Sequence, residues 1–224
     1  RPASLRLEGI YSHLAAASNT ELKDSVVAQK KEFEKFLDKL DQAGVKSENL
    51  IKHLAASGGS MGYPETHYDM VRIGLGMYGY YPSPEWEKTF ADKVKLEPAL
   101  TWKTILSEVK VIPEAGTVGY DCTEAVAAGA KLAVCPIGYW HGYPRHLSSL
   151  GLAQVNGVTV KAVGRVSMDM IVLDVTKVPE VKAGDEVTLL GPQGPTPAED
   201  ANLAHTSQYE IITCLNPLIE RFYV

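Results

Sequence analysis

The sequence predicts an α/β domain followed by an all-β domain. Three observations carry this prediction: an apolar pattern with helical spacing between short apolar runs in the first half, a break rich in proline at 80–87 (YYPSPEWE), and short β-rich runs between turn residues in the second half. We therefore expect residues 1–95 to form the α/β domain and residues 96–224 the β-domain.

The α/β half begins with an apolar run at 7–15, which we interpret as a short buried strand. Apolar residues then recur at helical spacing over 19–40. Ser18 or Asn19 can cap this helix, and Gly44 lies just past its end. This stretch is therefore predicted to be a long amphipathic helix after a strand.

Two more apolar runs, at 49–55 and 70–77, are predicted to be strands, and a short segment with Gly58, Gly59 and Gly62 separates them. Strands that alternate with helices through short connections are typical of parallel β/α units. Four such elements make about half of a (β/α)₈, or TIM-type, barrel. The first half of the chain is therefore expected to be a partial barrel.

The second half has the spacing of a small all-β domain, with Gly, Pro and Asp between the runs. The β-rich runs lie at 104–112, 131–137, 158–163, 170–175 and 186–190. The closing segment, 198–215, has a helical composition.

Composition excludes several classes of protein. The chain is 45% hydrophobic and 22% charged, so it can build cores, and its net charge of −5 without a basic block makes nucleic acid an unexpected partner. Its apolar runs are shorter than the roughly 18–20 residues of a membrane span, and no signal peptide is visible. Three widely spaced cysteines form neither a disulfide framework nor a metal knuckle, which favours a reducing, cytoplasmic compartment and no metal.

Six motifs resemble, in order and spacing, those of alanine racemases. The most specific are IGYWHGYPR at 137–145, VGRVSMD at 163–169 and VRIGLGMYG at 71–79. The others are SHLA at 12–15, AASG at 55–58 and QYEI at 208–211, and LEPAL at 96–100 matches the start of that family's β-domain. The resemblance covers essentially the whole chain. It implies a barrel that binds pyridoxal 5′-phosphate (PLP), a C-terminal β-domain that contributes to the partner subunit's active site, and a homodimer that interconverts L- and D-alanine.

Tyr139 is the residue that the resemblance assigns to catalysis on the L-amino acid. A tyrosine between Gly138 and Gly142 can also be a core or interface residue, and composition alone favours that interpretation. A phenol acts as a base near neutral pH only beside positive charge or suitable hydrogen bonds. The resemblance supplies His13 and Arg72 as those neighbours.

Arg72 stands in an apolar run, where a cation is costly unless its hydrogen bonds are accepted. It can be a structural arginine paired with a carboxylate. The resemblance implies instead that it faces the pyridine nitrogen of PLP, and because arginine keeps its proton, that nitrogen would stay unprotonated. His13 lies at the end of the first predicted strand, and barrel strands carry chemistry at their carboxyl ends, although a lone histidine there is usually structural.

The resemblance also assigns residues to the phosphate and to the substrate. Ser57 at a predicted helix start and the amides near Gly74 and Leu75 would hold the phosphate, and the hydroxyl of Tyr209 would contact it. The backbone amide of Met168 would lie near the substrate carboxylate. Glycine-rich turns without a ligand are the alternative for the phosphate residues.

The chain departs from the family's pattern in two ways. Trp140 and His141 stand where relatives usually have Ala and Asp. The lysine that binds PLP and acts as the base for the D-amino acid has no match, because neither Lys52 nor Lys103 lies in a comparable context. The chain also does not begin with methionine. We therefore expect a fragment that is inactive alone. A serine or broad-spectrum racemase and a non-catalytic dimerising fragment remain the alternatives.

Overall fold

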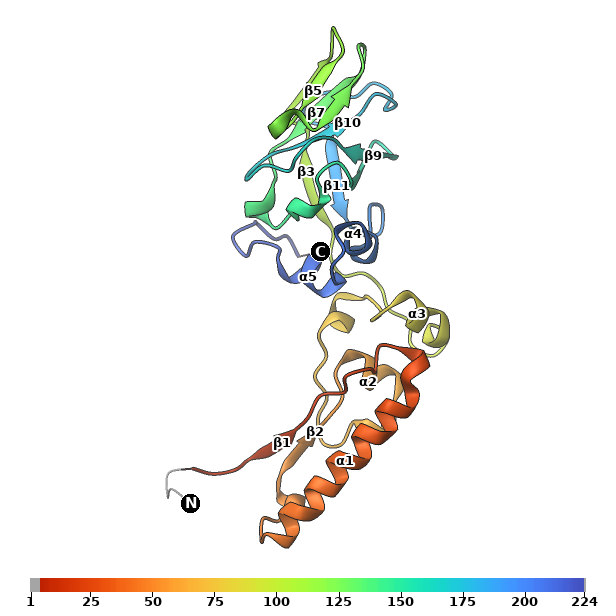
Figure 1. The fold of residues 1–224 in the computed structure, drawn as a ribbon, viewed down its shortest axis with the longest axis vertical. Coiled ribbons are helices and arrows are strands. Elements are labelled where there is room, and N and C mark those ends of the chain that lie inside the picture. Colours follow the sequence, from red (N-terminus) through yellow and green to blue (C-terminus); the bar gives the residue numbers. More distant parts are fainter. Residues whose placement is uncertain (1–4, 224) are drawn as a thin grey trace. The chain divides into compact units, whose positions relative to one another are not determined.

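The computed structural model describes residues 5–223 (Figure 1). The chain divides into two compact units, one that ends at Ala99 and one that begins at Leu100. The first unit contains helices and short parallel strands, and the second consists mainly of antiparallel strands. The predicted fold class is confirmed: a partial barrel of β/α units is followed by a β-domain.

The first unit is built around one β-α-β element. Strands β1 (Gly9–Tyr11) and β2 (Ile51–His53) pair in parallel, and helix α1 (Lys23–Gln42) connects them. Two shorter helices follow, α2 (Ser57–Gly62) and α3 (Pro84–Phe90). Short 3₁₀ turns cover Thr20–Leu22, Ser47–Asn49, Pro64–Thr66 and Leu75–Tyr78.

Helix α1 forms where the apolar spacing predicts it. The side chain of Asn19 accepts a hydrogen bond from the Glu21 amide at 2.9 Å, which caps the 3₁₀ turn that leads into the helix. Val26 and Phe33 are buried on the inner face of α1, and Gly44 takes a left-handed φ of 80° after its end. The helix packs on β1 and β2 through a core that contains Leu14, Ala17, Val26, Phe33, Leu54 and Tyr63 (Figure 1).

One prediction for this unit is wrong, and another is incomplete. The run at 70–77 is no strand: Ala56 and Arg72 form a single parallel bridge, and the chain then turns. The reason is that the amides of Gly74 and Gly76 bond to the Ser57 hydroxyl instead of a neighbouring strand. The YYPSPEWE run is also more than a break, because Pro84 occupies the first turn of α3, a position that suits proline.

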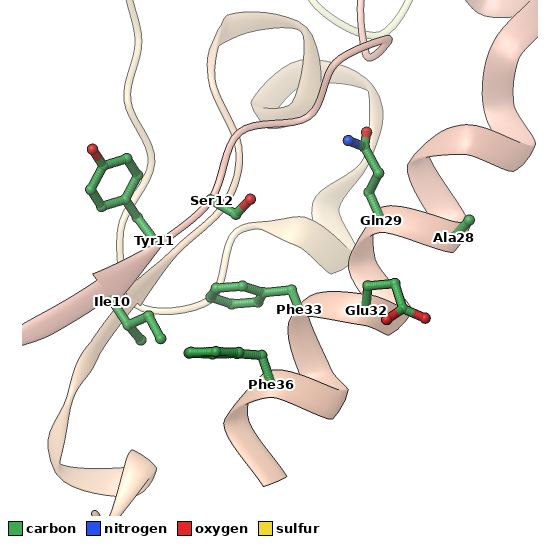
Figure 2. A pocket seen from close by; sticks show the side chains of 8 residues that line it. All are labelled: Ile10, Tyr11, Ser12, Ala28, Gln29, Glu32, Phe33 and Phe36. Carbon is green, nitrogen blue, oxygen red and sulfur yellow. The ribbon is translucent and has the colours of Figure 1, made fainter. Parts of the chain in front are cut away.

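One face of the first unit is an open apolar groove between β1 and α1, with a volume of about 480 Å³. Figure 2 shows Phe33 and Phe36 side by side on α1, facing Ile10 of β1. Phe36 is half exposed, and no strand pairs with the free edge of β1 in the described part of the chain. The groove has polar side chains at its rim, among them Ser12 and Glu32.

The second unit contains a seven-stranded antiparallel sheet with the strand order β3-β11-β8-β9-β10-β7-β4. Its strands are β3 (Trp102–Ile105), β4 (Glu108–Val111), β7 (Lys131–Cys135), β8 (Leu152–Val155), β9 (Val158–Ala162), β10 (Ile171–Asp174) and β11 (Glu186–Leu190). Strands β5 (Gly116–Val118) and β6 (Glu124–Val126) form a separate two-stranded ribbon.

This sheet curls because its two edge strands are consecutive in sequence. Only Leu106 and Ser107 lie between β3 and β4, so the two edges must be close together. The Leu106 amide donates to the Asp185 carbonyl beside β11, and the Ser107 amide donates to the Val134 carbonyl in β7. Leu106 is fully buried, in the core that the curled sheet encloses.

The β-rich runs are confirmed with small changes, and two further corrections apply. The run at 104–112 contains two strands because Leu106 turns into the core. The closing segment is two helices, α4 (Pro197–Ala204) and α5 (Gln208–Thr213), because His205 takes a left-handed φ of 52°. Strands β5, β6 and β8 were not predicted. Among the described residues, no helix combines the length and apolarity that crossing a bilayer requires.

Candidate active site

Arg72 is the centre of a polar cluster at the carboxyl ends of β1 and β2. Its guanidinium donates to the carbonyl oxygens of Ser12 (2.8 Å), His53 (3.3 Å) and Leu54 (3.3 Å). It also contacts Nδ1 of His53 at 2.7 Å and Nδ1 of His13 at 3.2 Å. No carboxylate pairs with it, and its Nε–H has no acceptor within residues 5–223. The cation is thus held by neutral acceptors and keeps one donor available.

The two histidines contact Arg72 through the same ring atom. Because arginine has no lone pair to offer, Nδ1 of each ring must be the acceptor, which leaves any ring proton on Nε2. Burial and then the charge of Arg72 lower the pKa of His53, so its ring stays neutral. The Tyr11 ring stacks on His53 at 5.1 Å and lies 5.3 Å from the guanidinium carbon.

His53 and Tyr11 are members of this cluster that the sequence interpretation missed. His53 ends the second strand, and Tyr11 ends the first. The same rule that singled out His13, that barrel strands carry chemistry at their carboxyl ends, applies to both residues. Applied to every strand end rather than only to the family motifs, the rule would have found them.

Ser57 is the first residue of α2, at a helix start as predicted, and is buried; the residue before it, Ala56, forms a bridge with Arg72. The Ser57 hydroxyl oxygen accepts hydrogen bonds from the amides of Gly74 (3.0 Å) and Gly76 (3.4 Å). Because the oxygen is the acceptor in both bonds, the hydroxyl proton is still available for donation to another group. The amide of Leu75, first in its 3₁₀ turn, makes no hydrogen bond in the described part of the chain. Two donors with no carboxylate bonded to them therefore suit an anion.

Tyr139 occupies a tight 3₁₀ turn, Tyr139–His141, in the second unit and is 43% exposed. Its amide donates to the Ser167 carbonyl at 3.0 Å, and the next amide, of Trp140, donates to the Met168 carbonyl at 2.9 Å. Two predicted site residues, Tyr139 and Met168, are therefore brought together by main-chain bonds. Met168 is exposed, and its own amide has no acceptor among the described residues.

Tyr209 lies in the first turn of α5, after Ser207, whose hydroxyl accepts from the Tyr209 amide at 3.2 Å. Partial burial raises the pKa of the Tyr209 phenol, so it stays a hydrogen-bond donor at neutral pH. A protonated phenol is what a contact with phosphate requires. Among the described residues, no hydrogen bond joins Tyr209 directly to Tyr139 or Met168, so it is a separate element of the candidate site.

Neither of the two lysines considered for the cofactor, Lys52 and Lys103, is free. Lys52 pairs with Asp69 at 3.2 Å and Lys103 with Glu186 at 2.7 Å, as ordinary ion pairs. No group of three or more His, Cys, Asp or Glu side chains within residues 5–223 could hold a metal ion.

Tyr120 is a second exposed phenol of the second unit, and sequence interpretation missed it. It stands between Gly119 (φ 83°) and two residues with left-handed backbone, Asp121 (φ 59°) and Cys122 (φ 51°). An ion pair of 2.7 Å joins Asp121 to Arg165. Strained backbone of this kind clusters at functional sites, so Tyr120 competes with Tyr139 for a catalytic role.

Two family models match the chain: "Alanine racemase, C-terminal domain" over residues 99–223 and "Alanine racemase, N-terminal domain" over residues 1–82. The alanine racemase of Desulfosudis oleivorans is 38% identical over 98% of this chain and 55% of its own length, and that of Symbiobacterium thermophilum is 39% identical over 98% and 57%.

Solved structures give the same likeness. The alanine racemase of Streptomyces lavendulae, a producer of D-cycloserine, has a TM-score of 0.87 at 34% identity and covers 98% of this chain and 56% of its own. The alanine racemase of Bacillus anthracis, with bound L-Ala-P, has a TM-score of 0.85 at 33% identity, over 95% and 54%. The chain thus spans about half the length of the relatives it matches.

Proposed function

Because the chain belongs to the alanine racemase family, we propose that the protein containing it interconverts L- and D-alanine, with PLP as cofactor and with active sites shared between the subunits of a homodimer. The observation that carries the proposal is the environment of Arg72. A guanidinium held by two imidazoles and three carbonyls, with no carboxylate, suits a neutral acceptor as its last partner.

The phosphate end of PLP fits the residues around Ser57. A dianion needs donors and no competing carboxylate, and the Ser57 hydroxyl and Leu75 amide are such donors. Gly74 leaves the space open, since a Cβ built there would meet only the Ser57 hydroxyl oxygen, at 4.0 Å. Tyr209 adds a phenol that burial keeps protonated. In this proposal, Ser57 and Leu75 of the first unit bind the phosphate beside the open space at Gly74, and the family resemblance adds the Tyr209 phenol.

The pyridine end fits Arg72. PLP, when bound, withdraws electrons from the α-carbon of the amino acid and so makes its α-proton acidic. The free Nε–H of Arg72 would donate to the ring nitrogen without transferring its proton. His13 and His53 orient the guanidinium through Nδ1, and the low pKa of His53 keeps that acceptor available. Arg72 thereby limits electron withdrawal to what proton exchange needs.

Proton exchange on the L-face is assigned to the Tyr139 phenol, and the Met168 amide would bind the substrate carboxylate. Their link through the Ser167 and Met168 carbonyls fixes both groups in one unit. The base on the opposite face would be the family's lysine, which has no match in the 224 residues. In a homodimer with shared sites, Tyr139 and Met168 of one subunit would act at the barrel of the partner subunit.

The test uses the full-length protein that contains this chain. Racemisation of L-alanine is followed by circular dichroism, beside L-serine, L-lysine and L-arginine, with and without PLP. PLP-dependent turnover of L-alanine, at the highest kcat/KM of the four, is expected. Higher efficiency with serine or the basic amino acids would favour the broader racemase, and a lack of PLP-dependent turnover with any of them would leave a non-catalytic dimerising module.

The base is identified by exchange of the α-proton in deuterated water. Tyr139→Phe is expected to slow exchange from L-alanine about 10²–10⁴-fold, the usual cost of a lost general base, and to affect D-alanine far less. Tyr120→Phe is the matched variant. If Tyr120→Phe shows the enantiomer-selective loss and Tyr139→Phe does not, the base is Tyr120.

A further inference from the structure

The turn that carries Tyr139 is wedged between two other segments. A Cβ at Gly138 would lie 2.3 Å from the Ser167 carbonyl oxygen, and a Cβ at Gly142 would lie 2.4 Å from the Cys214 carbonyl oxygen. Gly142 also has a φ of 102°, which side chains rarely adopt. Only glycine fits at either end, so the position of Tyr139 depends on both neighbouring segments.

His141 closes the turn from within. Its Nδ1 accepts a hydrogen bond from the buried amide of Gly138 at 3.1 Å, and its own amide donates back to the Gly138 carbonyl at 2.9 Å. An unpaired buried amide is costly, so this acceptor matters to the turn. The ring packs edge-on against Trp140, with 5.1 Å between ring centroids. The side chain of His141 thus fixes the residue before Tyr139.

Asn216 holds the turn from outside. Its Nδ2 donates to the Trp140 carbonyl at 2.9 Å, and its amide donates to the His141 carbonyl at 3.1 Å. Its Oδ1 accepts from the Leu218 amide at 2.9 Å, which fixes the side chain itself. One residue therefore binds both carbonyls that follow Tyr139.

We propose that His141 and Asn216 are positioning residues, which hold the Tyr139 phenol and the Met168 amide in one fixed arrangement for substrate. Main-chain bonds already join Tyr139 to Ser167 and Trp140 to Met168. A turn that loosens would therefore move both substrate contacts at once. The inference rests on the proposed function, because the arrangement positions a catalytic group only if Tyr139 and Met168 touch substrate.

The experiment compares four variants of the full-length protein: His141→Ala, His141→Asp, Asn216→Ala and, as a control, His146→Ala. Asp at position 141 keeps an acceptor for the Gly138 amide, as side chains do in a capping box. His146 is exposed and lies in the next turn, Arg145–Leu147. Two readouts are needed: kcat and KM for L-alanine, and hydrogen exchange of the amides from 138 to 142.

His141→Ala, which loses one hydrogen bond to the turn, and Asn216→Ala, which loses its one side-chain bond to the turn, are each expected to lower kcat/KM about tenfold. Exchange of the amides from 138 to 142 should accelerate, while PLP absorbance stays near that of the wild type. His141→Asp should return kcat/KM to within about twofold of the wild type, and His146→Ala should change nothing.

Two failures can be told apart. An active wild type with unchanged kinetics in His141→Ala and Asn216→Ala overturns the inference alone. Unaltered amide exchange in both variants also overturns it, since the turn would then be held by other contacts. A wild type without racemase activity refutes the proposed function, and the positioning role with it.

Discussion

Replacing Asp200 with Asn should stabilise the second unit above neutral pH. Asp200 lies on α4 with 2% of its surface exposed, and its Oδ1 has no hydrogen-bond partner among the described residues. Burial, followed by the charge of Glu199, raises the pKa of its carboxyl from 3.8 to about 7. The ionised form is therefore costly in the folded state.

The change in stability with pH follows from the difference in proton binding between the folded and unfolded states. The unfolded chain releases this proton near pH 4, whereas the folded chain keeps it until about pH 7, so the folded state binds more protons between these values. The contribution of Asp200 to stability is complete below pH 4 and is lost as pH rises to about 7. About three pKa units at 1.36 kcal/mol each make the loss roughly 4 kcal/mol.

The assay is urea denaturation followed by tryptophan fluorescence between pH 5 and pH 9, for the wild type and Asp200→Asn. The stability difference should grow with pH in favour of the variant and level off above about pH 8. Glu114→Gln, an exposed acid of the same unit, is the control for a change of charge alone. A difference that stays constant across this range would refute the argument.

Three further predictions concern other parts of the chain. Arg72→Glu should raise transamination relative to racemisation, measured as pyruvate formed per turnover of alanine, because a carboxylate would favour a protonated pyridine nitrogen; an unchanged ratio would make Arg72 structural. Gly151→Ala should destabilise by about 1–3 kcal/mol, because its Cβ would lie 2.0 Å from the Tyr143 hydroxyl, whereas Gly116→Ala, with its nearest atom at 4.0 Å, should not. Residues 1–99 expressed alone should associate through the groove at Phe36, and Phe36→Lys should reduce the mass measured by light scattering; a monomer in both cases would exclude the groove.

Helix α1 and most strands of the second unit were predictable because their apolar residues repeat at one fixed period. The helix buries Val26 and Phe33, seven residues apart, and β11 spans the predicted residues. The segment after Arg72 was not predictable in this way. Its apolar residues suggest a strand, but its amides bond to a hydroxyl 17 residues earlier in sequence, at Ser57, which no local pattern reveals.

The candidate site followed from motifs rather than from periodicity, and its omissions have the same cause. His13 and Ser57 are in motifs, whereas His53 lies outside them, and the parallel pairing of β1 and β2 is what brings its strand end beside that of β1. Tyr120 was missed because its interpretation depends on backbone angles: Asp121 belongs to a residue type that is enriched in left-handed backbone, but Cys122 does not.

Arg72 also argues against a purely structural interpretation of its cluster. A structural cation in a partly buried place usually pairs with a carboxylate. Lys52 does so with Asp69, which lies only three residues before Arg72 in the sequence. Arg72 instead has acceptors with no charge, and the low pKa of His53 means that its imidazole does not compete as a second cation. With one donor of Arg72 still available and the buried Ser57 hydroxyl on the adjoining segment, the folded state is stabilised further by a ligand with a neutral acceptor for the guanidinium and a phosphate for the hydroxyl. The protein should therefore gain thermal stability with PLP, and Arg72→Ala should lose most of that gain.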